Sequence, residues 1–128
     1  MRYGYTILYV PDVSATVDFY ERAFGLERRF VDPNGQYAEL ETGPTTLAFA
    51  ATDLIRAQGL HFRDHGPAGL PAAMEIGLTT DDVPTAVERA VQEGARLVAA
   101  PVTKPWGQVV AYVSDPDGVL VELCTPMG

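Results

Sequence analysis

Apolar residues recur along the chain in two rhythms, and each rhythm occurs in both halves. One has the spacing of a helix with a single apolar face. Its members are Val13, Val17, Tyr20 and Phe24 in the first half, and Val83, Val87 and Ala90 in the second. Each run follows an aspartate, Asp12 or Asp82, whose carboxylate suits the unpaired amides of a first helical turn. Each run is followed by a glycine, Gly25 or Gly94, so the pattern predicts two helices.

The other rhythm consists of short apolar or alternating runs and is typical of strands. It predicts four strands in the first half, at Tyr5–Val10, Glu27–Val31, Tyr37–Thr42 and Thr45–Ala51. It predicts four more in the second half, at Ala73–Thr79, Arg96–Val98, Gln108–Ser114 and Val119–Cys124. Turn-forming residues separate them, as in Asp32-Pro33-Asn34-Gly35 and Asp115-Pro116-Asp117-Gly118.

The order of these elements is itself repeated. Each half reads as a strand, a helix and then three strands, which predicts an α+β fold of two tandem βαβββ modules. We place module one at residues 1–51, a linker that contains His61 and His65 at 52–72, and module two at 73–128. The alternative is a ferredoxin-like sandwich, which has two strands per repeat. The module interpretation therefore depends on Glu27–Val31 and Arg96–Val98 being strands.

Composition and charge narrow the range of functions. The 128 residues fit one domain with a real core. With 17 acidic against 9 basic side chains, the net charge of −8 opposes binding to nucleic acid or anionic membrane surfaces. Cys124 is the only cysteine, which excludes an internal disulfide. No apolar run approaches the roughly 20 residues of a membrane span, and none resembles a signal segment, so we expect a cytoplasmic protein.

Several segments carry a family resemblance. The opening segments are Ile7-Leu8-Tyr9-Val10-Pro11-Asp12-Val13, Asp18-Phe19-Tyr20-Glu21 and Phe24-Gly25-Leu26, and the closing segment is Asp115–Leu123. In this order they resemble the vicinal oxygen chelate superfamily, which includes glyoxalases, bleomycin-resistance proteins and dioxygenases. Lys104-Pro105-Trp106-Gly107-Gln108 resembles a small single-domain branch of it. The resemblance implies two modules whose curved sheets enclose a cavity, and a homodimer.

In enzymatic members of that superfamily, a divalent metal is held by side chains from the first and last strands of each module. The matching positions here are Tyr5 and Ala48 in module one and Glu75 and Glu122 in module two. Ala48 has no ligand atom, and only Glu122 is a ligand typical of the superfamily. Strand alternation puts these four on one side, opposite apolar residues suited to packing under helices. Those apolar residues are Leu8, Val10, Leu47, Phe49, Met74, Ile76, Leu78, Val121 and Leu123.

Glu75 and Glu122 have two interpretations. As a cavity pair that shares a proton, one of them would have a raised pKa and act as a general base. Alternatively, each pairs with an arginine or binds water. Glu39 and Glu41 alternate along their strand and are expected to face solvent.

Trp106, the single tryptophan, lies in a turn flanked by proline and glycine. It either forms an aromatic wall for a planar or cationic ligand or closes one end of the barrel. Cys124 is expected to be a small buried apolar residue.

Three classes of function remain. The first is a metal-free pocket that binds or sequesters a small organic molecule, as bleomycin-resistance proteins do. The second is a divalent-metal-dependent lyase, isomerase or dioxygenase, with Glu122 and Glu75 as the available ligands. The third is a cofactorless enzyme with Glu122 or Glu75 as catalytic base. We favour the first, with no cofactor expected and with Tyr5, Ala48 and Trp106 lining the site. An acidic cavity favours a neutral or cationic ligand.

Overall fold

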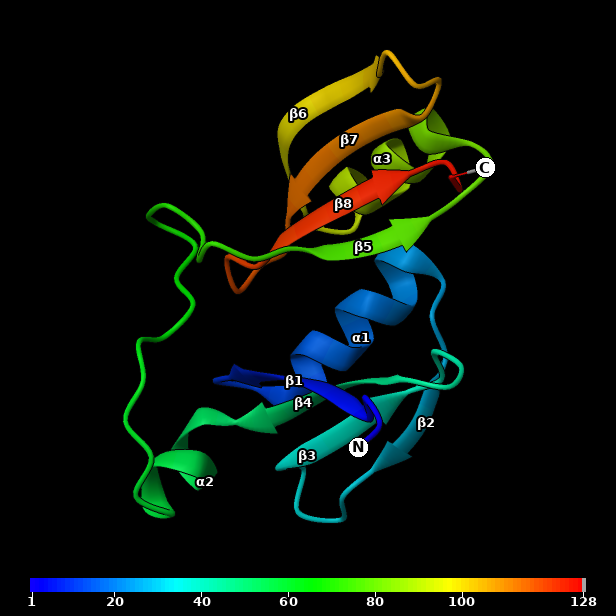
Figure 1. Ribbon diagram of the computed structural model, residues 1–128. Coiled ribbons are helices and arrows are strands. Elements are labelled where there is room, and N and C mark those ends of the chain that lie inside the picture. The colour runs from blue at the N-terminus through cyan, green and yellow to red at the C-terminus, as the bar shows by residue number, and fades with distance from the viewer. Residues whose placement is uncertain (128) are drawn as a thin grey trace. The chain divides into compact units, whose positions relative to one another are not determined.

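The structure, a computed structural model, describes residues 1–127. They form two compact units, residues 1–64 and 65–127, and each contains one four-stranded sheet (Figure 1). In the described part of the chain no helix is long and apolar enough to cross a membrane.

The first unit has the predicted order of elements. It runs β1 (Tyr5–Val10), α1 (Val13–Phe24), β2 (Arg28–Val31), β3 (Tyr37–Leu40), β4 (Thr46–Ala51) and α2 (Thr52–Ala57). The sheet order is β1-β4-β3-β2, with β1 parallel to β4 and the other pairs antiparallel.

The second unit repeats this arrangement. It runs β5 (Ile76–Thr79), α3 (Val83–Gln92), β6 (Arg96–Thr103), β7 (Val109–Ser114) and β8 (Leu120–Cys124). The sheet order is β5-β8-β7-β6, and β5 is parallel to β8. α1 and α3 are thus each followed by three strands of their own sheet, which confirms the α+β fold of two βαβββ modules and excludes the two-strand alternative.

Both predicted helix starts are confirmed. The Asp12 carboxylate accepts a hydrogen bond from the Ala15 amide at 3.1 Å, and the Asp82 carboxylate accepts one from the Thr85 amide at 3.2 Å. Each satisfies an amide that has no partner within the helix. Gly25 ends α1 in the left-handed conformation, at φ 70°.

The strand registers relate the two units residue by residue. Ile7 pairs with Ala48 in the first sheet, and Gly77 pairs with Glu122 in the second. Counting back two residues from each makes Tyr5 the counterpart of Glu75. Counting forward five residues from Ile7 and from Gly77 reaches the helix caps Asp12 and Asp82. The register therefore agrees with the correspondence of the four positions inferred from the sequence.

One face of each sheet is covered by a helix (Figure 1). In the first unit Leu8, Val10, Leu47 and Phe49 are buried on the α1 side. The Phe49 ring lies 5.0 Å from the Tyr20 ring of α1, between ring centroids. The opposite face of each sheet, called the open face below, carries the strand residues that alternate with these buried ones. In the second unit Val121 and Leu123 are likewise buried.

Two strand boundaries differ from the prediction more than the others do. The predicted strand Ala73–Thr79 begins only at Ile76, because the Met74 amide bonds to the Ala72 carbonyl in a tight turn. Met74, expected under the helix, is exposed. The strand predicted at Arg96–Val98 continues to Thr103. It contains Pro101, which is tolerated because β6 is an edge strand with irregular pairing.

The two ends of the predicted linker make contacts, each within its own unit. Its first residues form α2, and Phe62 stacks on Tyr9 of β1 with ring centroids 4.9 Å apart. Arg56 of α2 lies 4.3 Å above the Phe62 ring and pairs with Asp64 at 2.8 Å. Further on, the Pro67 carbonyl accepts a hydrogen bond from Arg96 at 3.2 Å.

Candidate functional site

The open face of the second sheet carries two carboxylates and a phenol. Register places Gly77, Glu122 and Tyr112 side by side on β5, β8 and β7. The Tyr112 hydroxyl donates a hydrogen bond to Glu122 Oε1 at 3.0 Å. Glu75 lies just before β5, two residues before Gly77, and strand alternation therefore places it on the same face as Gly77. Gly77 itself has no side chain beside Glu122. The structure thus brings together the two predicted glutamates.

The electrostatics of this group favour a proton or a cation. Partial burial raises the pKa of Glu75, and the Glu122 charge and a hydrogen bond with Glu122 raise it further. The hydrogen bond to Glu122 raises the pKa of Tyr112. Among residues 1–127, neither glutamate forms an ion pair with a basic side chain. An arginine partner is therefore not present among these residues, and the alternative that each glutamate binds water stays a prediction.

The equivalent face of the first sheet has its charge neutralised. Ala48 is fully buried, and the neighbouring strand places Glu39 directly beside it. Arg29 Nη2 pairs with Glu39 Oε1 at 2.7 Å, and the Tyr37 hydroxyl donates to Glu39 Oε2 at 2.7 Å. These contacts, first the one with Arg29, lower the pKa of Glu39. Glu39 therefore does not simply face solvent, as its alternation suggested.

Tyr5 lies at the edge of this first face. It pairs in register with Thr46, and it is 59% exposed. The Thr46 hydroxyl accepts a hydrogen bond from Arg29 at 3.0 Å.

The side chains at the four positions do not fit a transition metal. Zinc, iron and nickel sites normally use imidazole or thiolate ligands, and both histidines lie outside the strands. Ala48 offers no ligand atom, and the carboxylate of the neighbouring Glu39 already forms an ion pair with Arg29. Nowhere in the described chain do three or more His, Cys, Asp or Glu side chains gather into a possible metal site.

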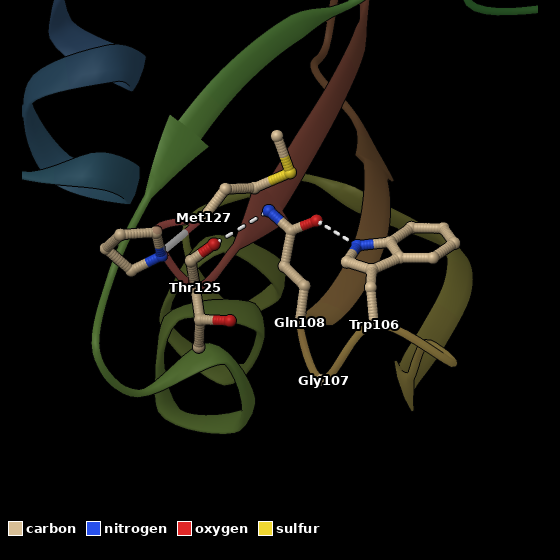
Figure 2. Close-up of a pocket in the computed structure, with 6 residues that line it drawn as sticks. Trp106, Gly107, Gln108, Thr125 and Met127 are labelled. Carbon is tan, nitrogen blue, oxygen red and sulfur yellow. Dashed lines mark hydrogen bonds between the residues drawn. The ribbon is translucent and has the colours of Figure 1, made fainter.

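A pocket of about 540 Å³ lies where β7 begins and β8 ends. It is lined by Trp106, Gly107, Gln108, Thr125, Pro126 and Met127. The Trp106 indole N–H donates to Gln108 Oε1 at 2.9 Å, and Gln108 Nε2 donates to the Thr125 carbonyl at 2.8 Å (Figure 2). Trp106 is 65% exposed, which favours the aromatic-wall interpretation over a buried plug.

Sequence reasoning missed Tyr112 and Gln108. Strand alternation places both on the open face beside β8, and this alternation was the signal in the sequence that could have found them. Their importance follows only from the pairing with β8, which sequence does not show. Cys124, as expected, is buried, and burial raises the pKa of its thiol to about 11.

Comparison with known proteins agrees with this architecture. Residues 2–123 match the family model described as the Glyoxalase/Bleomycin resistance protein/Dioxygenase superfamily. The chain belongs to this superfamily. A solved glyoxalase-related enzyme from Fulvimarina pelagi has the same fold, with a TM-score of 0.82 at 22% identity over 98% of this chain and 88% of that one.

Two relatives of known name are similar in sequence. A lactoylglutathione lyase of Escherichia coli O157:H7 is 32% identical over 96% of this chain and 91% of its own length. A lactoylglutathione lyase of Arabidopsis thaliana is 30% identical over 95% of this chain, which spans only 43% of that plant protein. These similarities establish the superfamily and leave the specific activity to be inferred from the site.

Proposed function

We propose that this member of the superfamily binds a small neutral or cationic organic molecule on the open face of the second sheet, without a resident metal. The observation that carries the proposal is the pair Glu75 and Glu122, held with Tyr112 and, within residues 1–127, without an ion pair to a basic side chain. Two adjacent carboxylates, of which Glu122 is half-buried and Glu75 is exposed, favour a cation or a hydrogen-bond donor and penalise an anion.

A cofactorless enzyme is the second candidate. It is favoured by the raised pKa of Glu75, because a carboxylate whose pKa lies closer to neutrality is a better proton acceptor. The pair and the phenol would then hold a substrate and accept its proton. A metal-dependent lyase is supported by the names of the relatives, but Ala48 and the Arg29–Glu39 pair leave it few ligands.

We expect protein purified without a chelator to carry no stoichiometric zinc, iron, nickel or manganese. Two carboxylates, a phenol and water would hold a divalent ion only loosely. EDTA should therefore leave the thermal unfolding midpoint unchanged. Elemental analysis that finds close to one of these metals per chain would overturn the proposal and put the metal-dependent enzyme first.

The second test measures ligand charge. Calorimetric titration with a primary amine, and with a carboxylic acid and an alcohol of the same size, should rank the amine first and the acid last. Glu122→Gln should weaken amine binding about tenfold or more, because it removes a charge-assisted hydrogen bond. Amine affinity should rise with pH as Glu75 ionises, since its pKa is raised and protonation at lower pH removes a negative charge.

Glu88→Gln is the matched control, because Glu88 is an exposed glutamate of α3 in the same unit. It removes the same formal charge from a different surface. Amine binding should stay within about twofold of the original, because an exposed distant charge is largely screened. An equal loss of amine affinity in Glu88→Gln and Glu122→Gln would mean that only the net charge of the protein matters. The proposed site at Glu122 would then be wrong.

A further inference from the structure

The segment that follows α2 turns back over one end of the open face of the first sheet. Along β1 the residues on that face are Tyr5, Ile7 and Tyr9. Tyr5 is 59% exposed and Ile7 is 42% exposed, whereas Tyr9 is only half-buried because the Phe62 ring lies against it, at 4.9 Å between centroids. Phe62 therefore covers the Tyr9 end of this face and leaves the other end uncovered.

A single side chain of α2, Arg56, holds Phe62 in this position. Its guanidinium carbon lies 4.3 Å from the centre of the Phe62 ring, and its Nη2 pairs with Asp64 at 2.8 Å. A cation over the face of an aromatic ring is attracted to it. Phe62 is thus in contact with the sheet through Tyr9 and with the helix through Arg56.

Residues 60–64 are held by side chains alone. Among residues 1–127, no hydrogen bond joins their backbone to the backbone of another segment. The two members of the ion pair are both exposed, with 41% of the Arg56 side chain and 58% of the Asp64 side chain accessible. Contacts of this kind contribute little when they are exposed. A segment without backbone hydrogen bonds and with few buried contacts opens more readily than the strands beneath it.

Both ends of this segment are anchored. α2 packs beside β4 and β1, and Thr52 at its start is buried. The Gly59 amide bonds to the Arg56 carbonyl at 2.9 Å, and Gly59 has φ +93°, a conformation that reverses the chain after the helix. Beyond the segment, Arg96 donates a hydrogen bond to the Pro67 carbonyl. The chain between these anchors is therefore free to lift without disturbing either sheet.

We propose that residues 60–64 form a strap that opens and closes over the Tyr9 end of the first sheet, with Arg56 as its latch. In the closed position Phe62 covers Tyr9. In the open position the uncovered face extends along β1 from Tyr5 to Tyr9. A ligand that contacts Tyr9 binds the open form alone and shifts the population toward it. This inference is independent of the proposed function, which concerns the second sheet.

Trypsin measures the opening, because Arg63 is an exposed residue of the strap. The protease cleaves after Arg63 only when the neighbouring residues leave the sheet, so the initial rate follows the population of the open form. Arg56→Gln and Tyr9→Leu should each raise this rate about five- to tenfold, the effect of losing one or two exposed contacts. Arg56→Lys should raise it less, because an ammonium group keeps the charge. Mass spectrometry identifies the fragments that end at Arg63.

Arg28→Gln is the matched control. Arg28 lies in the same unit, its side chain is 47% exposed, and it pairs with Asp18 and Glu21. The variant therefore removes the same charge and an exposed ion-paired group away from the strap. Cleavage after Arg63 should stay within about twofold of the original rate, because distant sites act independently. Circular dichroism and the unfolding midpoint show whether each variant is folded.

The fluorine resonance of Tyr9 gives a second measurement, in protein labelled with 3-fluorotyrosine. The resonance is assigned by its disappearance in Tyr9→Phe. Phe62→Ala serves as the uncovered reference, because no ring then lies against Tyr9. Arg56→Gln should move the Tyr9 resonance toward its position in Phe62→Ala, whereas Arg28→Gln should leave it in place.

Urea separates local opening of the strap from unfolding of the whole unit. Up to about 1 M urea should leave the cleavage rate after Arg63 nearly unchanged, because lifting the strap exposes little surface. A rate that rises with urea as steeply as global unfolding would show that no separate opening exists. Unchanged cleavage and an unmoved Tyr9 resonance in Arg56→Gln would remove the latch. A rise in Arg28→Gln equal to that in Arg56→Gln would mean that the lost charge alone matters, and the inference would be wrong.

Discussion

Replacing Phe49 by alanine is expected to lower the free energy of unfolding by roughly 3–5 kcal/mol, the usual cost of removing a buried aromatic ring. Phe49 is 0% exposed on β4 and packs against Tyr20. Tyr20 in turn lies 5.2 Å from Phe24 and 5.6 Å from Phe19, between ring centroids, so one aromatic cluster joins α1 to its sheet. The loss combines missing apolar contacts with a cavity that the neighbouring rings cannot close.

Phe30→Ala is the control for this prediction. Phe30 lies on the edge strand β2 and is 49% exposed, so its loss should cost no more than about 1 kcal/mol. Urea denaturation followed by circular dichroism gives both values. Because small proteins are stable by only about 5–15 kcal/mol, Phe49→Ala should also unfold at a markedly lower temperature. Similar losses in the two variants would contradict the placement of the core.

The fold could be predicted because its signals are local. Aspartate caps and apolar helical spacing mark both helices, and turn residues separate the strands. The errors occurred where tertiary context overrides a local rule. The strand predicted at Arg96–Val98 continues through Pro101, because at the edge of a sheet the missing amide of proline costs nothing. Residues 52–57 were assigned to a linker, whereas they form the short helix α2, whose packing beside β4 and β1 is not visible in the sequence.

The candidate site could be predicted only in part. The glutamates were found by combining a family resemblance with strand alternation, which indicates the face that a residue occupies. Tyr112 and the Arg29–Glu39 pair were missed because they depend on which residues lie opposite each other on adjacent strands. Register of that kind is set by the whole sheet and has no local signature.

The duplicated units have diverged in charge. In the second unit the carboxylate lies on β8, at Glu122, and no basic side chain of the described residues forms an ion pair with it. In the first unit the equivalent position is Ala48, and the acidic group lies one strand away, at Glu39, where Arg29 neutralises it. The negative potential is therefore concentrated on one of the two open faces. This asymmetry is the reason to look for a cationic group at the second sheet and not at the first.

The turn before β8 gives the second large expected effect. Gly118 has φ +93°, and a β-carbon there would clash with the Gly66 carbonyl group and lie 3.0 Å from the Pro67 nitrogen. Gly118→Ala should therefore combine backbone strain with a forced shift of residues 66–67, at a total cost of about 2–4 kcal/mol. The shift should also weaken the hydrogen bond from Arg96 to the Pro67 carbonyl.

Gly59→Ala separates these two contributions, because Gly59 has the same φ of +93° and nothing lies within 4 Å of its added β-carbon. It should cost only about 1–2 kcal/mol, the price of the left-handed conformation. Denaturant unfolding measures both losses, and hydrogen exchange at residues 65–70 should rise in Gly118→Ala alone. Since this turn leads directly into β8, the same variant should weaken amine binding at Glu122, whereas Gly59→Ala should not. Equal costs for the two variants, with unchanged exchange at 65–70, would show that the segment around Gly66 does not rest on the turn.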